Sequence, residues 1–208
     1  IVAASGAPPV PTSTFRDCSG CTSYSGWGVQ PVDPASETWG VLAALLDVPR
    51  PAELGFGRDV RAPGCYSRLA LAEAWRIEAP SRRQKYDLEL ADVQRSVTVI
   101  CRSSGSQLPV VSTKLDASVA GHFATNGAVN EKILLHGTRA DAVEPILSSG
   151  FNERFCDGIF GKGCYLGEDA AKVDQYCMAD TDGQGWRPDG LDTPSGGGDV
   201  FYVFVCRA

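Results

Sequence analysis

The chain has 208 residues, of which 43% are hydrophobic and 21% are charged. It is therefore long enough to bury a core and too apolar for a disordered or fibrous protein. No stretch reaches the roughly 18 to 20 consecutive apolar residues of a membrane-spanning helix, and the first residues lack the basic and long apolar regions of a secretory signal. The net charge is -6 and the longest basic run is Arg82-Arg83, which argues against direct nucleic-acid binding and against a membrane partner.

Eight cysteines are scattered along a chain that is large enough to fold without disulfides. A disulfide framework and a reduced intracellular protein, cytoplasmic or nuclear, both remain open, and the chain size favours the second. Cys18 and Cys21 form a CxxC pair, but no second pair follows at the spacing of a zinc finger. We therefore expect no metal, and we expect Cys156, Cys164 and Cys177 to be small core residues.

The first third of the chain is predicted to be an irregular segment followed by helices. Residues 1–33 are rich in Pro, Gly, Ser and Thr and show no sustained periodicity, so we expect an irregular segment over the surface. A short helix is predicted from Ser36, which can cap it, to Pro49, which ends it. Further helices are predicted over 68–78 and, with Ser81 as its cap, over 81–95. Residues 34–95 thus form a predicted helical region.

The remainder, 96–208, has the pattern of a sheet with interspersed helices. Helices are predicted after Thr138, where Val143, Ile146 and Leu147 share one face and Gly150 ends the helix, and over 168–177. β-Branched or apolar runs predict strands over 97–101, 108–113, 132–136, 164–166 and 200–206. The expected fold class is α+β, with helices first and a mostly antiparallel sheet after them.

Four motifs follow one another between residues 134 and 177. They are His136-Gly137-Thr138 at a strand end, Ser149-Gly150-Phe151 at a helix end, the FGKGCY turn at 160–165, and Asp174-Gln175-Tyr176 at the end of a helix. In this order and spacing they resemble the catalytic domain of the poly(ADP-ribose) polymerase family, on its tankyrase-like and mono-ADP-ribosylating side. Residues 199–208 and, more loosely, 73–86 extend the resemblance.

The resemblance implies an ADP-ribosyltransferase fold, a mostly antiparallel β core flanked by short helices, with 96–208 as its catalytic core. The family's third catalytic position, a Glu in polymer-forming members, lies on a strand after the one at 200–206. Since the chain starts without Met and ends in an apolar run, we expect a fragment whose catalytic core is truncated at the C-terminus.

The implied activity is that of a glycosyltransferase of the pentosyl-transferring type. NAD is the substrate, ADP-ribose passes to side chains of a protein acceptor, and nicotinamide leaves. Cleaving the bond between nicotinamide and ribose develops positive charge on the sugar while a neutral ring departs, so binding geometry supplies most of the catalysis. With the third position missing, single-unit transfer is favoured over polymer synthesis.

The same resemblance implies roles for five residues. His136 donates a hydrogen bond to a hydroxyl of the adenosine ribose, and Gly137 binds the nicotinamide carboxamide through its backbone. A side chain at position 137 would block that close approach. Tyr165 and Tyr176 enclose the nicotinamide ring, and Thr138 reaches the ribose while capping its helix. We expect His136 and Tyr165 to be the catalytic residues.

Three departures from the family pattern keep an alternative open. Val173 stands where many members carry a Ser that also binds the carboxamide, so one anchoring hydrogen bond is missing. The loop 152–159 is short, and the family's third catalytic position is absent. The zinc of tankyrases does not carry over either, because 178–205 contains neither Cys nor His. The alternative is a catalytically degenerate module that binds NAD, ADP-ribose or a protein partner.

Overall fold

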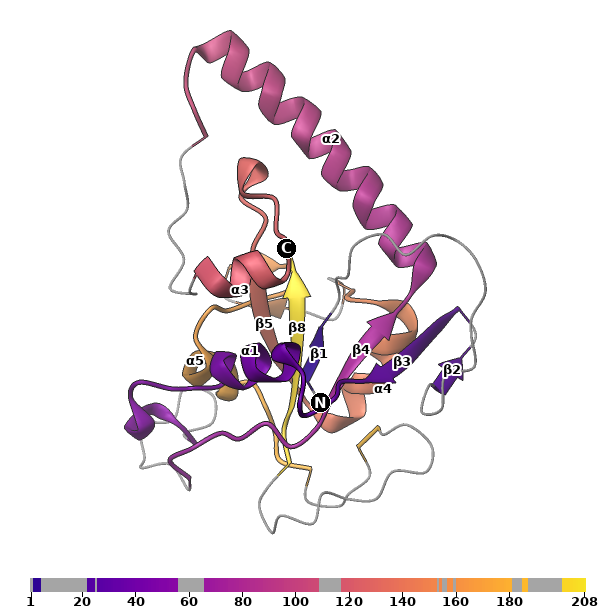
Figure 1. Cartoon of the computed structure of the whole chain (residues 1–208), viewed down its shortest axis with the longest axis vertical. Coiled ribbons are helices and arrows are strands. Elements are labelled where there is room, and N and C mark those ends of the chain that lie inside the picture. Colours follow the sequence, from indigo (N-terminus) through magenta and orange to yellow (C-terminus); the bar gives the residue numbers. More distant parts are fainter. Residues whose placement is uncertain are drawn as a thin grey trace.

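Six strands form the central sheet of the computed structural model, which describes residues 2–4, 22–24, 26–55, 66–108, 117–152, 154, 157–158, 160–180, 185–186 and 200–208. Their order is β2-β3-β4-β1-β8-β5 (Figure 1). They span Val2–Ala4 (β1), Thr22–Tyr24 (β2), Trp27–Pro31 (β3), Ala74–Glu78 (β4), Ile133–Thr138 (β5) and Tyr202–Arg207 (β8). Strand β1 runs parallel to both β4 and β8, whereas the pairs β2–β3, β3–β4 and β5–β8 are antiparallel. The sheet is therefore mostly antiparallel, as predicted.

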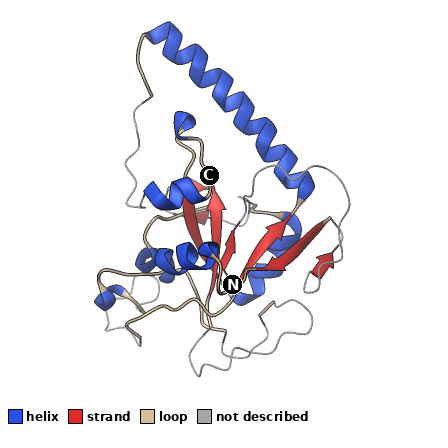
Figure 2. Ribbon diagram, viewed as in Figure 1, coloured by secondary structure: helices blue, strands red, loops and turns tan. Residues whose placement is uncertain are grey.

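Helices lie on both faces of this sheet (Figure 2). The α-helices are Glu37–Leu45 (α1), Pro80–Ser104 (α2), Ala117–His122 (α3), Ala140–Ser149 (α4) and Ala170–Asp174 (α5). Two short 3-10 helices, Pro51–Glu53 (η1) and Gly127–Val129 (η2), and a small hairpin of β6 (Asp157–Gly158) and β7 (Gly161–Lys162) complete the described elements. This arrangement is consistent with the α+β class.

The sheet separates two apolar cores, because successive side chains of a strand point to opposite faces. On β8, Val203 and Val205 join the core that contains residues of α1, α3 and α5. Tyr202 and Phe204, which alternate with them, join the core that contains residues of α4. Strand β8 therefore carries side chains into both cores.

Several predicted elements are confirmed. The Ser36 hydroxyl accepts a hydrogen bond from the backbone N–H of Trp39 at 3.2 Å, which makes Ser36 the cap of α1 as expected. The predicted strands near 132–136 and 200–206 correspond to β5 and β8. The predicted helix after Thr138 corresponds to α4, whose Val143 and Leu147 are buried.

Two predictions in the first half of the chain are wrong. The segment 1–33 is not irregular throughout, because its described residues 2–4, 22–24 and 27–31 form β1, β2 and β3. The buried Trp27 and Val29 of β3 share the core with α4. The predicted helix over 68–78 is instead an extended segment that leads into β4. Strand β4 lies between β1 and β3, so pairing with distant residues outweighs the local helical pattern. The sheet thus takes β4 from the region predicted to be helical, and β1, β2 and β3 from the segment predicted to be irregular.

The β-branched run at 97–101 is also not a strand. It continues α2, which ends where Gly105 adopts a φ of 65°. Within a helix the hydrogen bonds are local, so this run needs no partner strand. Helix α2 begins at Pro80 after Ala79, so Ser81 is not its cap. The strand predicted over 108–113 lies outside the described residues from position 109 onward.

Two smaller predictions near the motifs are wrong as well. Arg139, not Thr138, is the residue before α4, and no side chain caps that helix. Residues 164–166 are not a strand, although the next residue, Gly167, forms a single β-bridge with Leu135. The helix predicted over 168–177 is present as the shorter α5.

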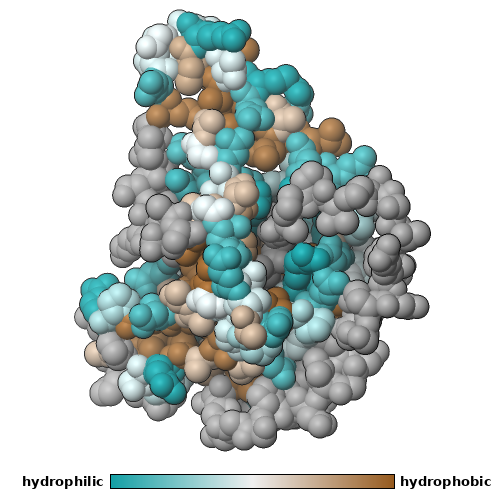
Figure 3. Space-filling view, viewed as in Figure 1, coloured by the Kyte–Doolittle hydropathy of each residue, from teal (hydrophilic) through white to brown (hydrophobic). Residues whose placement is uncertain are grey.

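Helix α2 extends away from the sheet, and none of its residues is fully buried (Figure 1). Leu88, Val99 and Ile100 are each more than half exposed, and Figure 3 shows apolar residues between hydrophilic ones along this helix. Within the part of the chain that the structure describes, no helix combines the length and apolarity that a membrane crossing requires.

Candidate functional site

Strand β5 carries the His136-Gly137 pair and is bonded on both edges. Strand β8 pairs with it in antiparallel register on one side. On the other side, Leu135 and Gly167 exchange two backbone hydrogen bonds, of 2.7 and 2.8 Å. The segment that contains Tyr165 is therefore fixed alongside β5, next to His136.

The His136 ring is held by Tyr165 and Phe151. Its Nδ1 lies 2.9 Å from the Tyr165 carbonyl oxygen, and the Phe151 ring meets it edge-on at a centroid distance of 4.8 Å. Burial lowers the pKa of His136, and the bond to the Tyr165 carbonyl opposes this effect. The resulting neutral ring must donate from Nδ1, because a carbonyl only accepts, and this leaves Nε2 as an acceptor. The role of His136 toward a ribose hydroxyl stays a prediction.

Gly137 is required by the packing of β5 against α5. A Cβ at this position would lie 2.7 Å from the sulfur of Cys177 and 3.0 Å from Cγ1 of Val173, and still closer to the Val173 carbonyl oxygen. Real Cβ atoms do not approach backbone oxygen so closely, so any larger residue would push α5 away from the sheet. The sequence suggested glycine at this position only because a side chain would block the carboxamide, so the packing requirement was not predicted.

Tyr165 supports the β6–β7 hairpin as well as His136. Its hydroxyl donates to the Gly161 carbonyl at 2.6 Å and accepts from the backbone N–H of Phe160 at 3.2 Å. Its ring covers Gly158, where a Cβ would lie 2.5 Å from the hydroxyl oxygen and 2.7 Å from Cε2. The ring nevertheless remains 37% exposed. Tyr165 therefore presents an aromatic surface that the hairpin holds in place.

Tyr176 lies one residue beyond Gln175, the C-cap of α5, and so two residues after the last residue of the helix. Its side chain is 43% exposed, and its backbone N–H donates to the Val173 carbonyl at 3.0 Å, so it continues the helical turn. The ammonium group of Lys172 lies 5.4 Å from the centre of the Tyr176 ring. The position of Tyr176 is thus determined by the placement of α5.

Thr138 and Val173 are mainly core residues. Thr138 is only 7% exposed, which leaves little of its side chain for a ribose. Val173 is buried in the core beside α1 and α3, and its methyl groups fill the space beside Gly137 and Gly167. The thiol of Cys177 lies 3.7 Å from the Val173 carbonyl oxygen, and burial raises its pKa to about 12. Cys177 is a core residue, as predicted.

The structure adds one group that the sequence argument did not select. Asp174 is buried in α5, and its two carboxylate oxygens accept hydrogen bonds from the Tyr66 hydroxyl and the Gly55 backbone N–H. The signal available in the sequence was an acidic residue within a short helix of small and apolar residues. Its two partners, more than a hundred residues away, could not be identified from spacing.

No cluster of metal-ligating side chains occurs within the ranges that the structure describes. Cys18, Cys21 and Cys156 lie outside those ranges, so the predicted absence of a zinc site at the CxxC pair stays a prediction.

The sequence model of a protein family, described as the poly(ADP-ribose) polymerase catalytic domain, matches residues 60–208 of this chain. The match covers more than half of the chain. The chain belongs to this family. The match includes the four motifs between residues 134 and 177, together with β4, β5, β8 and α5. It excludes β3, α1 and η1, although the first two supply buried residues to the cores. The ADP-ribosyltransferase fold and its association with NAD are therefore established at the level of the family.

A curated protein described as "Poly [ADP-ribose] polymerase tankyrase" from Caenorhabditis elegans is also similar to this chain. The two are 29% identical over 152 residues, which cover 68% of this chain and 6% of that protein. This chain thus spans a small part of its relative. The similarity supports the family and does not specify a branch within it.

Proposed function

We propose that this domain transfers ADP-ribose from NAD to side chains of a protein acceptor and releases nicotinamide. The observation that carries the proposal is the geometry around β5 in a chain of this family. The His136 ring is oriented by the Tyr165 carbonyl, and the adjacent Gly137 is fitted against α5, which leads to Tyr176. Two exposed tyrosines and a preoriented imidazole suit a substrate with an aromatic amide at one end and a ribose hydroxyl at the other.

In the proposed reaction, the bond between the ribose C1′ and the nicotinamide nitrogen breaks, and its electron pair returns to the pyridine ring. A nucleophilic oxygen or sulfur of the acceptor forms the new bond to C1′, and any proton that it carries passes to solvent water. His136 accepts a hydrogen bond from a ribose hydroxyl at Nε2, the Gly137 backbone binds the carboxamide, and Tyr165 and Tyr176 enclose the ring. Fixing the substrate in a bent conformation then supplies most of the rate enhancement.

Single-unit transfer is the favoured product. Elongation needs a carboxylate that activates an ADP-ribose hydroxyl, and three of the described acids near β5 and α5 already have protein partners. Glu131 is bonded to Tyr86, Asp169 accepts from the backbone N–H of Ala171 as the cap of α5, and Asp174 is bonded to Tyr66. Amino-acid side chains such as carboxylates and thiolates are better nucleophiles than a sugar hydroxyl and can attack without such help.

We further propose an intracellular setting, with no direct nucleic-acid or membrane partner and no catalytic metal.

The test is the His136→Ala variant, with the other histidine of the chain as a control. Loss of one hydrogen bond to a buried hydroxyl should weaken NAD binding by about 1 to 3 kcal/mol, measured by calorimetry. The His122→Ala variant, which loses a contact with Thr38 on α1, should bind NAD as the wild type does. Equal NAD affinity of His136→Ala and wild type would contradict the site.

Incubation with labelled NAD, followed by gel electrophoresis, tests the product. Discrete labelled protein that does not form a ladder is expected, and long polymer would contradict single-unit transfer.

The alternative, a module that binds NAD or ADP-ribose or a protein partner without turnover, is favoured by Val173. Its buried methyl groups supply no hydrogen bond to the carboxamide. Binding of NAD without release of nicotinamide would support that alternative.

A further inference from the structure

The carboxylate of Asp174 is one of two that are almost completely buried among the described residues, at 4% exposure. Its Oδ1 accepts a hydrogen bond of 2.6 Å from the Tyr66 hydroxyl, and its Oδ2 accepts one of 2.9 Å from the Gly55 N–H. We refer to Asp174, Tyr66 and Gly55 as the α5 clasp. Burying a carboxylate is unfavourable unless its oxygens are bonded, so the clasp commits α5 to one arrangement with these partners.

The clasp connects α5 to two other parts of the fold. The Tyr66 ring packs against Phe201, directly before β8, at a centroid distance of 5.1 Å. Gly55 follows η1 and lies outside the part of the chain that matches the family. A residue that precedes the matched range therefore contacts the helix that leads to Tyr176.

Helix α5 depends on such contacts for its orientation, because it spans only residues Ala170–Asp174 and so short a helix is not stable alone. The fit of Val173 beside Gly137 fixes its distance from β5. That fit alone does not set the rotation of α5 about its own axis. Asp174, the next residue around the helix, supplies a second attachment in a different direction.

We propose that Asp174 is a positioning residue of the nicotinamide end of the site, and that Tyr66 and Gly55 act through it. The clasp sets the rotation of α5, and this rotation places the Tyr176 ring relative to the Gly137 backbone. This inference rests on the proposed function, since it assigns the nicotinamide ring to the space beside Tyr176. It predicts that loosening the clasp impairs the nicotinamide end of the site and spares the ADP-ribose end.

The experiment compares two ligands in three variants by calorimetry. 3-Aminobenzamide probes the nicotinamide end and ADP-ribose probes the other end. Asp174→Asn and Tyr66→Phe should each weaken 3-aminobenzamide about tenfold, the coupling expected within one hydrogen-bond network, with ADP-ribose affinity unchanged. The double variant should weaken 3-aminobenzamide by less than the product of the two single effects, because both changes act on one hydrogen-bond network. If Asp174→Asn does not fold, Tyr66→Phe, which removes one oxygen and keeps the ring on Phe201, carries the test.

Tyr86→Phe is the matched control. It removes a tyrosine hydroxyl from another buried carboxylate, Glu131, at a distance of 2.5 Å, and it should leave the affinities for both ligands unchanged. Equal weakening of both ligands by the clasp variants, or of neither, would overturn the positioning role while leaving the proposed function intact. A wild-type chain that binds neither ligand would overturn both.

Discussion

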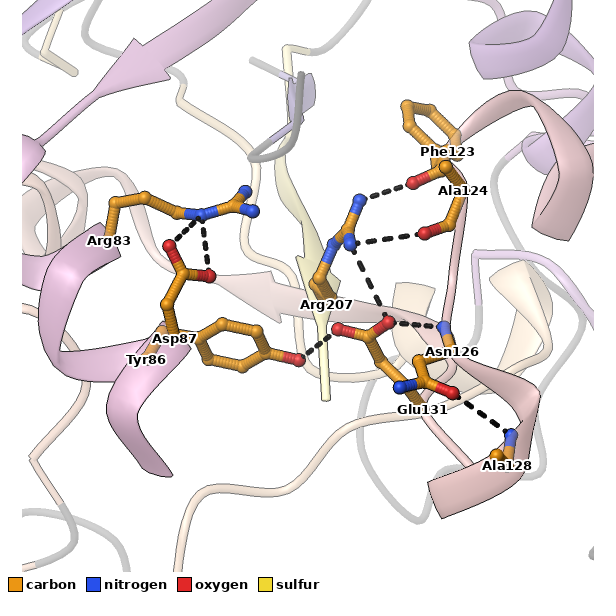
Figure 4. Close-up of polar contacts among 9 residues, drawn as sticks. All are labelled: Arg83, Tyr86, Asp87, Phe123, Ala124, Asn126, Ala128, Glu131 and Arg207. Atoms are coloured by element: carbon orange, nitrogen blue, oxygen red, sulfur yellow. Dashed lines mark hydrogen bonds and ion pairs between the residues drawn. The ribbon is translucent and has the colours of Figure 1, made fainter. Parts of the chain in front are cut away.

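Glu131 and Asp174, the two buried carboxylates among the described residues, are nearly equal in exposure and very different in surroundings. Glu131 lies between η2 and β5 and is 3% exposed. It accepts hydrogen bonds from the Tyr86 hydroxyl and the Asn126 backbone N–H, and it forms an ion pair with Arg207 at 3.5 Å (Figure 4). Asp174, in contrast, accepts from two neutral groups, a hydroxyl and a backbone N–H.

The difference follows from what each carboxylate joins. The Glu131 network ties the start of α2 to the end of β8, and the Arg207 guanidinium also bonds to the Phe123 and Ala124 carbonyls (Figure 4). Glu131 contacts the N-terminal part of α2, and the rest of that helix extends away from the sheet. The role of these contacts is therefore to stabilise the fold. Asp174 is in the helix that leads to Tyr176. Similar burial thus serves stability in one region and the geometry of the site in the other.

The largest expected effect is the loss of stability on replacing Glu131. Glu131→Ala removes the partner of a nearly buried guanidinium and should lower the free energy of unfolding by about 3 to 5 kcal/mol, measured by urea denaturation. In the folded fraction, 3-aminobenzamide affinity should match the wild type. Asp141→Ala, which breaks an exposed ion pair with Arg139, is the control and should leave the urea midpoint unchanged. A loss as small as that of the control would show that the network contributes little.

An intermediate effect is expected where α5 meets β5. Gly137→Ala places a methyl group against the Val173 carbonyl and the Cys177 sulfur, so it should destabilise the chain by about 1 to 3 kcal/mol. It should also abolish 3-aminobenzamide binding, because α5 must move. The control is Gly163→Ala, since a Cβ there meets nothing within 4 Å. Full stability and binding in Gly137→Ala would contradict the packing argument.

The smallest effect concerns alkaline pH. Burial, and secondarily the Asp174 charge, raises the pKa of Cys177 from 9.0 to about 12. Between these values the unfolded thiol loses its proton and the folded one keeps it, so stability is complete below pH 9 and falls as pH rises above it. The Cys177→Ala variant should lack this part of the decline, about 1 kcal/mol at pH 10. Urea titrations at pH 8, 9 and 10 measure it, and equal slopes in variant and wild type would contradict the assignment.

Tyr86, whose hydroxyl bonds to Glu131, allows a second measurement of stability against pH. Burial and the bond to Glu131 raise the pKa of Tyr86 above its ordinary value of 10.0, so its contribution to stability is complete below pH 10 and lost above it. Tyr86→Phe should therefore flatten the decline only at higher pH than Cys177→Ala does. A variant that flattens the curve already at pH 9 would not fit this order.

The sequence by itself determined the elements and motifs whose signals are local. The Ser36 cap of α1, the apolar run of β5 and the Val143–Leu147 face of α4 depend on residues within one helical turn or one strand. The order and spacing of the motifs from His136 to Tyr176 were sufficient for the family resemblance, which the match over 60–208 supports. The roles of those residues toward NAD stay predictions.

The tertiary structure decided what depends on distant partners. Residues 74–78 are a strand because β1 and β3 lie on either side of them, whereas the β-branched residues 97–101 stay helical in α2. Likewise, the His136 ring takes its orientation from a carbonyl 29 residues away, which meets its Nδ1. Asp174 acquires its partners 108 and 119 residues along the chain. Sequence patterns report local preference, and these positions are governed by hydrogen bonds and close contacts that exist only once the chain has folded.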